Sequence, residues 1–353
     1  MKILVLLYAL SSGGAERFAV DLSNELVEAG HQVTVVTTDN DAIGSNSFNR
    51  AELRPEVQYI NLGARSGHQL SALLGINRVI RQLKPDVVHA NTQLIPILLP
   101  LLCFRRAHYV NTIHNVAECF LKSPLLKPLY RHLYKHRVTP VTISGYCSQS
   151  FRSLYGLDTD VTIVNGRNRP TCSEEAGAVR AKMQAFSQGH PVFIHMARYS
   201  AQKNQQVLFE ALHRFPQVRL VVLGKDYPDS LIQSEDASQV WFAGEQHHVA
   251  DYLACSDYFL LSSLFEGLPI TLLEALSYGV VPISTPAGGV VDVIRDGENG
   301  FLARGFDADA LAAAIQRALF SPIDGEQMTE EYRRNYTMRA CAARYEQLFK
   351  SLL

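Results

Sequence analysis

Short apolar runs rich in β-branched residues alternate with segments of helical periodicity along the first half of the chain. Parallel strands covered on both faces read as continuous apolar runs, and each return connection between them carries a helix. The pattern therefore predicts a βαβ series folded into one doubly wound domain. Its expected strands and helices are Ile3–Leu7, Ala15–Glu28, Gln32–Thr37, Leu73–Leu83, Val87–Ala90, Ile95–Phe104, Tyr109–Ile113 and Val141–Ile143.

The strand pattern stops between residues 165 and 189, where Gly, Arg, Asn, Pro, Ser and Glu dominate. Such a polar stretch predicts an interdomain linker. A second alternating series follows it, and two helices near 309–319 and 330–352 are expected to close the chain. The segments of this series are Val192–Met196, Gln205–Arg214, Arg219–Leu223, Val240–Ala243, Val249–Cys255, Tyr258–Leu261, Ile270–Tyr278 and Val281–Ser284.

The two series predict an α/β fold of two Rossmann-like domains whose parallel sheets face each other across a cleft. We expect an N-terminal domain over residues 1–168, a C-terminal domain over 169–335, and a last helix over 336–353 that crosses back to the N-terminal domain. Ligands of doubly wound sheets bind beyond the carboxyl ends of the strands, so the functional residues should follow strands. The polar linker further predicts that the domains close over a ligand.

Composition and charge exclude several classes of protein. The 353 residues, 47% of them hydrophobic and 19% charged, suit two compact domains and not a disordered chain. A net charge of -1 lacks the basic excess of a nucleic-acid-binding protein, so no nucleic acid partner is expected. The six cysteines include no C-x-x-C pair and are expected to be reduced thiols.

Two apolar runs raise the question of a membrane or export signal. Ile3–Leu10 covers eight residues and leads into Gly13-Gly14 and a helical pattern, which favours a buried first strand over a signal peptide. Leu94–Phe104 covers eleven residues, about half of what spans a bilayer. We therefore expect no transmembrane helix and a cytoplasmic protein.

The most informative motif follows the expected strand Tyr258–Leu261 and opens the next helix. Backbone N–H groups at a helix start, together with the helix dipole, form an anion site that suits a diphosphate. Gly267 would let the backbone approach a ligand, and Pro269 suits the first helical turn. Glu266 precedes this helix and Glu274 is expected about two turns into it, so the two carboxylates can face one ligand.

This segment resembles the family 4 retaining glycosyltransferases of GT-B fold, which carry a Glu, seven residues and a second Glu. The match extends from Ser262 to Pro282, although two residues and not one separate Gly279 from Pro282. The resemblance implies that Glu266 contacts the donor sugar and Glu274 the ribose hydroxyls. It also implies that the diphosphate is bound by the backbone of four residues, Leu268, Pro269, Ile270 and Thr271.

A second match lies at Ala197-Arg198-Tyr199-Ser200-Ala201-Gln202-Lys203-Asn204, after the strand Val192–Met196. Two cations at the carboxyl end of a strand can neutralise the charge of a departing nucleoside diphosphate. The resemblance implies that Arg198 and Lys203 bind the donor phosphates. Ala197 departs from the Gly that many relatives carry there.

Candidate residues of the first half also follow strands. Gly13 and Gly14 separate the first strand from the first helix, but they do not form G-x-G-x-x-G, which disfavours a dinucleotide site. The resemblance places this turn over the donor phosphates and the acceptor pocket. His114 lies just past Tyr109–Ile113, and the resemblance puts it near the reacting sugar. Asn165-Gly166 resembles the turn before the family's linker, but Arg167 and Asn168 replace the usual hydrophobic residue and Asp.

A basic segment over residues 122–137 leaves two interpretations open. Apolar residues recur in it at helical spacing, and no acidic residue occurs between Glu118 and Asp158. The segment either contacts an anionic membrane surface, where lipid-linked acceptors reside, or is a solvated basic face over an ordinary buried stripe.

The sequence thus predicts a retaining enzyme that moves a hexosyl or N-acetylhexosaminyl group from a nucleoside diphosphate sugar to a hydroxyl of a glycan or lipid-linked glycan. A UDP-sugar is the preferred donor, and retention follows from the resemblance alone. No cofactor and no metal are expected, since Asp39-Asn40-Asp41, the nearest approach to D-x-D, reads as a loop. The alternatives are a non-catalytic nucleotide-sugar-binding subunit and another GT-B enzyme, such as a nucleotide-sugar epimerase or a pyridoxal-dependent phosphorylase.

Overall fold

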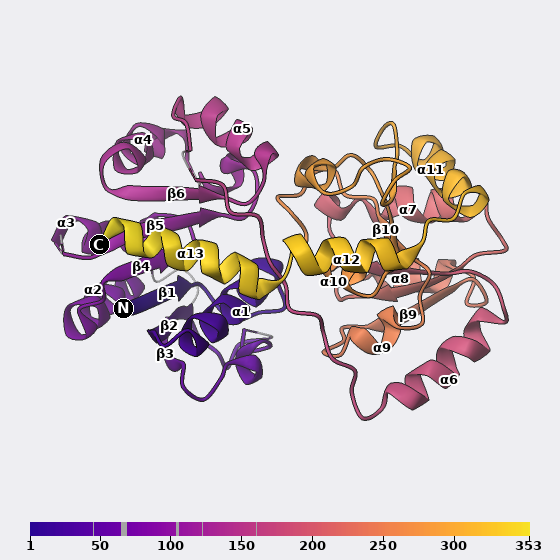
Figure 1. The fold of residues 1–353 in the computed structure, drawn as a ribbon, viewed down its shortest axis with the longest axis horizontal. Helices are drawn as coiled ribbons and strands as arrows, with labels where there is room; N and C mark the ends of the chain where they lie inside the picture. Colours follow the sequence, from indigo (N-terminus) through magenta and orange to yellow (C-terminus); the bar gives the residue numbers. More distant parts are fainter. Residues whose placement is uncertain (45, 65–68, 104–105, 122, 160) are drawn as a thin grey trace. The chain divides into compact units, whose positions relative to one another are not determined.

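The structure is a computed structural model that describes the chain except for residues 45, 65–68, 104–105, 122 and 160. It divides into two compact units (Figure 1). The N-terminal unit comprises Met1–Arg167 together with Tyr336–Leu353, and the C-terminal unit comprises Asn168–Asn335. One unit is therefore built from two separate pieces of chain, and the other from one continuous piece.

The N-terminal unit holds a six-stranded sheet in the order β3-β2-β1-β4-β5-β6, and every pair in it is parallel. The chain starts in the middle of the sheet, moves outward to β3, and returns to β4 on the other side of β1. The strand order therefore reverses between β1 and β4, where ligands of such sheets bind. The strands are β1 (Lys2–Leu7), β2 (Gln32–Asp39), β3 (Gln58–Ala64), β4 (Val87–Ala90), β5 (His108–Ile113) and β6 (Val138–Thr142).

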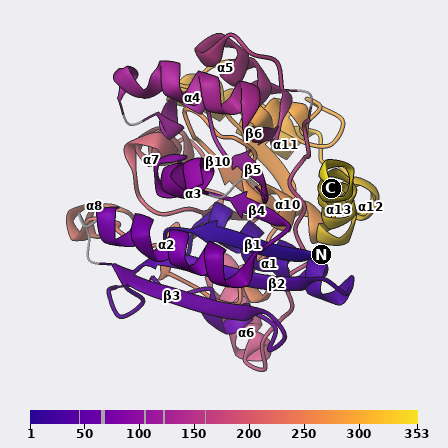
Figure 2. The same ribbon diagram turned by 90° about the vertical axis from the view of Figure 1, so that its left-hand side faces the viewer.

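Helices cover this sheet, and the last helix of the chain is one of them (Figures 1 and 2). The helices are α1 (Gly14–Glu28), α2 (Gln69–Leu83), α3 (Leu98–Cys103), α4 (Lys127–His136), α5 (Gly145–Tyr155) and α13 (Met338–Leu352). Helix α13 contacts α1 through an apolar face with buried Tyr345 and Phe349. The Tyr345 ring lies 5.7 Å from that of Phe18 on α1, and its hydroxyl lies 2.9 Å from Thr112 Oγ1 on β5. The C-terminus is thereby part of the N-terminal core.

The C-terminal unit repeats this topology. Its parallel sheet has the order β12-β11-β10-β7-β8-β9, so the strand order reverses between β7 and β10. The strands are β7 (Val192–Met196), β8 (Arg219–Leu223), β9 (Val240–Gly244), β10 (Tyr258–Leu261), β11 (Val281–Ser284) and β12 (Phe301–Leu302). The helices are α6 (Ala176–Ser187), α7 (Gln205–Leu212), α8 (Asp229–Ser234), α9 (Ala250–Leu253), α10 (Ile270–Ser277), α11 (Ala308–Phe320) and α12 (Gly325–Asn335).

The predicted pair of doubly wound parallel sheets is confirmed, with three local corrections. The expected linker contains α6, which the apolar pattern hid because the helix buries only Met183. The expected helix over 330–352 is two helices, α12 and α13, because Thr337 caps α13 by accepting a bond from the Ala340 N–H. The edge strands β3 and β12 were missed, since one is only partly buried and the other has two residues.

The structure also bears on two other expectations, the contacts of Arg167 and the presence of a membrane-spanning helix. Arg167, which replaces the family's hydrophobic residue, is buried and pairs with Asp21 on α1 at 2.6 Å. Among the helices that the structure describes, none is long and apolar enough to cross a membrane.

Candidate active site

The candidate site of the C-terminal unit lies where the sheet order reverses. The loops that follow the neighbouring strands β7 and β10 are tied together by three hydrogen bonds. Ser262 Oγ donates to the Lys203 carbonyl at 2.7 Å, and the Leu264 N–H donates to the Gln202 carbonyl at 2.8 Å. The Gln202 side chain donates in turn to the Phe265 carbonyl at 2.9 Å. The two motifs of the sequence therefore form one structure.

An ion pair joins the same two loops. Lys203 Nζ lies 2.6 Å from Glu266 Oε1, and Ser263 Oγ donates to that same oxygen at 2.6 Å. The side chains of Lys203 and Glu266 are 18% and 7% exposed, so water screens their attraction only weakly. Both bonds fall on Oε1 and so fix the direction of the carboxylate. Ser263 thus belongs to the candidate site by its contact with Glu266, and the sequence analysis did not single it out.

The third neighbouring loop, which follows β11, contacts the Glu266 segment through the backbone. The Gly289 N–H donates to the Glu266 carbonyl at 3.0 Å, and Thr285 Oγ1 donates to the Ser263 carbonyl at 2.6 Å. Three loops from adjacent strands thus hold the residues around Glu266 in place.

Helix α10 begins directly after this segment with its first turn uncapped. Pro269 occupies the cap position, just before the first helical residue, and makes no side-chain cap. The first N–H groups of the helix have no acceptor within it, so those of Ile270 and Thr271 can serve an anion. Glu274 is the fifth residue of α10 and is buried. It lies just over one turn into the helix, not two, because Gly267, Leu268 and Pro269 are not helical.

The loop that carries Arg198 is shaped by a residue outside the predicted motif. Arg198 is exposed, and its carbonyl accepts a hydrogen bond from Gln205 Nε2 at 2.8 Å. Gln205 is 1% exposed, and its Oε1 accepts from the Ser200 N–H at 3.3 Å. Asn204 takes the left-handed conformation (φ 51°) that starts α7. Gln205 was missed because a Gln on a helix start carries no pattern of its own.

In the N-terminal unit, Gly13 occupies the cap position of α1 and Gly14 is its first helical residue. His114 follows β5, and its ring packs edge-on against Phe18 of α1 with centroids 5.1 Å apart. Its Nε2 lies 2.7 Å from Oδ1 of Asn91, which follows β4. Burial lowers the pKa of His114 to about 3, so the imidazole is neutral at physiological pH.

Two further features bear on the chemistry. Among the residues that the structure describes, no group of three His, Cys, Asp or Glu side chains is placed to hold a metal ion. Asp41, of the nearest approach to D-x-D, accepts hydrogen bonds from Tyr59 at 2.8 Å and from Asn61 at 3.0 Å. These bonds give Asp41 a role in the loop that follows β2.

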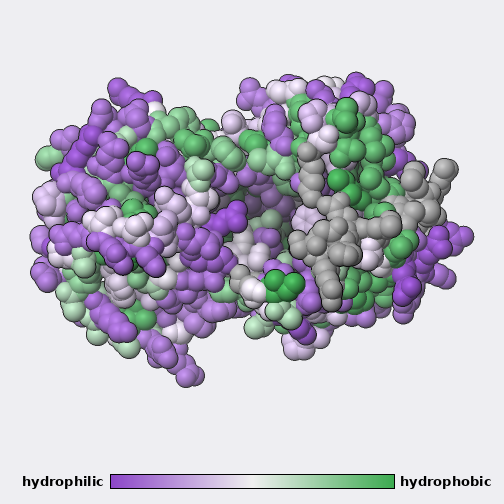
Figure 3. Space-filling view, turned by 180° about the vertical axis from the view of Figure 1, so that it is seen from behind, coloured by the Kyte–Doolittle hydropathy of each residue, from purple (hydrophilic) through white to green (hydrophobic). Residues whose placement is uncertain are grey.

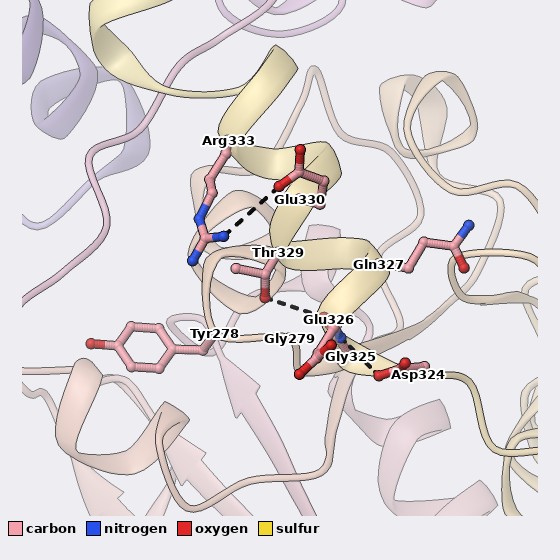
Figure 4. Close-up of a pocket in the computed structure, with 9 residues that line it drawn as sticks. All are labelled: Tyr278, Gly279, Asp324, Gly325, Glu326, Gln327, Thr329, Glu330 and Arg333. Atoms are coloured by element: carbon pink, nitrogen blue, oxygen red, sulfur yellow. Dashed lines mark hydrogen bonds and ion pairs between the residues drawn. The ribbon is translucent and has the colours of Figure 1, made fainter.

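A separate cavity of about 670 Å³ lies between the end of α10 and α12 (Figure 4). Arg333 and Glu330 of α12 approach to 3.8 Å beside it. No residue predicted for the site lines this cavity. Its lining residues are Tyr278, Gly279, Asp324, Gly325, Glu326, Gln327, Thr329, Glu330 and Arg333.

Comparison with known proteins identifies both halves of the chain. The family model described as Glycosyltransferase Family 4 matches residues 12–166, and that of Glycosyl transferases group 1 matches residues 180–335. LpsE, a lipopolysaccharide core biosynthesis glycosyltransferase of Rhizobium meliloti (strain 1021), is 28% identical over 310 residues. That alignment covers 86% of this chain and 85% of LpsE.

Solved structures agree in fold over the whole chain. The sucrose-phosphate synthase of Thermosynechococcus elongatus superposes with a TM-score of 0.84 at 18% identity, covering 100% of this chain and 99% of that one. Anabaena HepE in complex with UDP-glucose gives a TM-score of 0.82 at 19% identity and covers 99% and 100% of the two chains. At these identities the likeness shows the fold, which is GT-B. Together with the two family matches, this identifies the chain as a glycosyltransferase that belongs to family 4.

Proposed function

We propose that this glycosyltransferase moves a hexosyl or N-acetylhexosaminyl group from a nucleoside diphosphate sugar, preferably a UDP-sugar, to a hydroxyl of a glycan or lipid-linked glycan. We further propose that the anomeric configuration is retained and that no metal ion is required. The observation that carries the proposal is the Lys203–Glu266 pair beside the uncapped start of α10. It supports a site in which one ligand meets a cation, a carboxylate and free backbone N–H groups.

Charge stabilisation of the leaving diphosphate drives the proposed reaction. The start of α10 offers the N–H groups of Ile270 and Thr271 and a positive dipole end, and Arg198 and Lys203 add two cations. Glu266 would hold hydroxyls of the donor sugar, and Glu274 would hold those of the ribose. In the N-terminal unit, the Gly13-Gly14 turn would contact the donor phosphates. His114 would accept a hydrogen bond near the sugar without adding charge, because its imidazole is neutral and its Nε2 faces Asn91 Oδ1.

The relatives support the choice of donor and acceptor. HepE was solved with UDP-glucose, which favours a UDP-sugar over a GDP-sugar. LpsE is named for lipopolysaccharide core biosynthesis, which favours a cell-surface glycan as the acceptor. Both assignments come to this chain by similarity.

The test is calorimetric binding of UDP, GDP and their common sugar conjugates to the wild type, Lys203→Ala and Glu274→Ala. We expect one nucleotide series to bind tightly and both variants to lose that binding. Arg214→Ala is the matched control, because its pair with Asp309 lies on the surface of the same unit. Binding without turnover by the pure protein would favour the non-catalytic subunit instead, and dependence of turnover on a divalent metal would contradict the metal-free mechanism.

We also propose that the basic segment contacts an anionic membrane at the cytoplasmic face, where a lipid-linked acceptor would be reached. Leu125 and Leu129 are 89% and 41% exposed, and Lys127 and Lys135 of α4 are exposed beside them. Tyr130, Leu133 and Tyr134 of the apolar stripe are buried, as its alternative interpretation expects, and Lys122 lies outside the described residues. Apolar side chains also gather on the face of the N-terminal unit that is seen on the right in Figure 3.

Sedimentation with vesicles tests the membrane contact. We expect binding to vesicles that contain phosphatidylglycerol, weaker binding at high salt, and little binding to pure phosphatidylcholine. Lys127→Glu with Lys135→Glu should abolish it. Wild-type sedimentation that is equally low with both vesicles would refute the contact and leave the enzymatic proposal intact.

A further inference from the structure

Asn91 lies at the carboxyl edge of the N-terminal sheet, where the strand order reverses between β1 and β4. Its Oδ1 is 2.7 Å from His114 Nε2. A carbonyl oxygen can only accept, so the proton of this bond is on Nε2 and the tautomer of His114 is fixed. Asn91 is therefore the direct partner of the candidate histidine.

The backbone around Asn91 is held from three sides. The Asn91 N–H donates to the Leu6 carbonyl of β1 at 2.9 Å. Asn111 of β5 donates through Nδ2 to the carbonyls of Ala90 and Thr92, both at 2.9 Å, on either side of Asn91. The Tyr134 hydroxyl of α4 donates to Asn111 Oδ1 at 2.8 Å. This network fixes where the Asn91 side chain points before any ligand arrives.

The Nδ2 group of the Asn91 amide has no hydrogen-bond acceptor within the described ranges of the chain. Asn91 is 8% exposed, and its Nδ2 finds no acceptor among the residues that the structure describes. Leaving a buried amide donor unsatisfied is destabilising, so the group calls for an explanation, and a bound ligand provides one. Gln93 lies two residues further along the same loop, and its Oε1 is buried with no hydrogen-bond partner in the described part of the chain. The loop after β4 thus offers one unmet donor and one unmet acceptor.

A hydroxyl group both donates and accepts, and neighbouring hydroxyls on a sugar ring supply both functions side by side. The network holds only neutral groups at this point, which disfavours a phosphate or a carboxylate as the ligand. We propose that Asn91 Nδ2 donates a hydrogen bond to a ring hydroxyl of a substrate sugar, while Oδ1 orients His114. Gln93 Oε1 accepts from a hydroxyl of the same sugar. The inference deepens the proposed function and rests on it for the identity of the substrate as a sugar.

The sugar can come from the acceptor or from the donor, and titrations of the full chain distinguish the two. The side-chain amide signals of Asn91 in ¹⁵N-labelled protein are assigned by their loss in Asn91→Asp. Methyl hexosides of glucose, galactose, mannose and N-acetylglucosamine probe the acceptor. UDP and GDP, each with and without its hexose, probe the donor. A shift caused by a hexoside, or by a nucleotide sugar but not by the bare nucleotide, supports the contact and names its source.

If none of these ligands moves the signals, the inference is wrong. The proposed function would still stand in that case, provided that a nucleotide binds the C-terminal unit in the same titrations. Failure of every nucleotide to bind would count against the proposed function, and the hexosides would still decide for or against Asn91.

Asn91→Asp keeps the oxygen that accepts from His114 and replaces the NH₂ group with a second oxygen. We expect an affinity loss of about 10-fold or more for the sugar that moves the amide, with affinity for the bare nucleotide unchanged. Asn24→Asp is the control, because Asn24 Nδ2 already donates to the Glu52 carbonyl at 2.8 Å. Unchanged sugar affinity with only a displaced pH profile would overturn the contact. Asn91→Ser replaces Asn91→Asp for assignment and affinity if the latter does not fold.

Discussion

In the C-terminal unit, the loops at the reversal of strand order meet through opposite charges, Lys203 and Glu266, with Ser263 on the same oxygen. In the N-terminal unit, the loops that follow the next pair of strands, β4 and β5, meet through the neutral side chains of Asn91 and His114. The same topology thus carries a charged site in one unit and an uncharged one in the other. A charged group suits a diphosphate and a neutral amide suits a hydroxyl, so the two sites differ in the ligand chemistry that each of them offers.

Breaking the charged pair should have the largest effect. Lys203→Met leaves the Glu266 carboxylate buried with Ser263 but without its cation, and we expect about 3 kcal/mol less stability in the C-terminal unit. Loss of a phosphate contact should also slow turnover by about 10²–10³-fold. Adding Glu266→Gln should restore most of the stability and none of the turnover. Denaturant unfolding and initial rates measure the two effects.

The control for this prediction is again Arg214→Ala. Its pair with Asp309 is exposed, so its loss should cost less than about 1 kcal/mol. Equal destabilisation by Lys203→Met and Arg214→Ala would mean that the buried Lys203–Glu266 pair contributes no more to stability than an exposed pair does.

The sequence predicted the charged site better than the neutral one, for a physical reason. Motif residues of the C-terminal unit lie within two short segments, so their local context and their resemblance to the family's motifs single them out. The Lys203–Glu266 contact itself spans 63 residues, and it was readable only through the topology. Gln205 and Ser263 act by side-chain bonds to Arg198, Ser200 and Glu266, which lie three to seven residues away, but a spacing pattern does not show which way a side chain points. Asn91 was missed in the same way, since a single Asn after a strand reads as an ordinary turn.

Burial also decided which elements of the fold could be predicted from the sequence. Wholly apolar runs such as Ile3–Leu7 predicted the central strands, because a covered parallel strand has no polar face. The edge strand β3 (Gln58–Ala64) has only partly buried or exposed residues and so gave no such run. Helix α6 was hidden for the same reason, because a helix with one buried side chain lacks an apolar stripe.

The two units also differ in how they are assembled, because only the N-terminal unit is built from two separate pieces of chain. A second prediction tests the contact between these pieces. A Cβ on Gly166 would lie 2.5 Å from the Thr337 carbonyl oxygen and 2.6 Å from the Cys341 Cβ, where α13 begins. Gly166→Ala should therefore displace α13 and destabilise the N-terminal unit by about 2 kcal/mol. Thermal unfolding, and hydrogen exchange within 338–352, measure the loss.

Gly177→Ala is the matched control in the C-terminal unit. A Cβ there meets nothing within 4 Å, and Gly177 lies in helix α6, so alanine should be neutral or stabilising by about 0.5–1 kcal/mol. Normal protection of 338–352 in Gly166→Ala would show that α13 does not depend on this close contact.

The smallest expected effect is a difference between the two units in how much stability each loses at acid pH. Burial lowers the pKa of His89 and His114 in the N-terminal unit to about 3, and that of His195 in the C-terminal unit to about 4. Unfolding returns each imidazole to a pKa near 6.5, so the unfolded chain binds more protons below that pH. The stability from the neutral histidines is complete above pH 6.5 and is lost as the pH falls toward the folded pKa values. The N-terminal unit has two such histidines and the C-terminal unit has one. By pH 5.5 the free energy of unfolding should therefore fall by about 1 kcal/mol more in the N-terminal unit.

Hydrogen exchange of the two units between pH 7 and pH 5, corrected for intrinsic rates, measures this difference. His89→Gln removes one of the two groups and should reduce the pH dependence of the N-terminal unit to about that of the C-terminal unit. Parallel losses in the two units would mean that acid acts on carboxylates common to both. Acid sensitivity would then no longer distinguish the neutral site from the charged one.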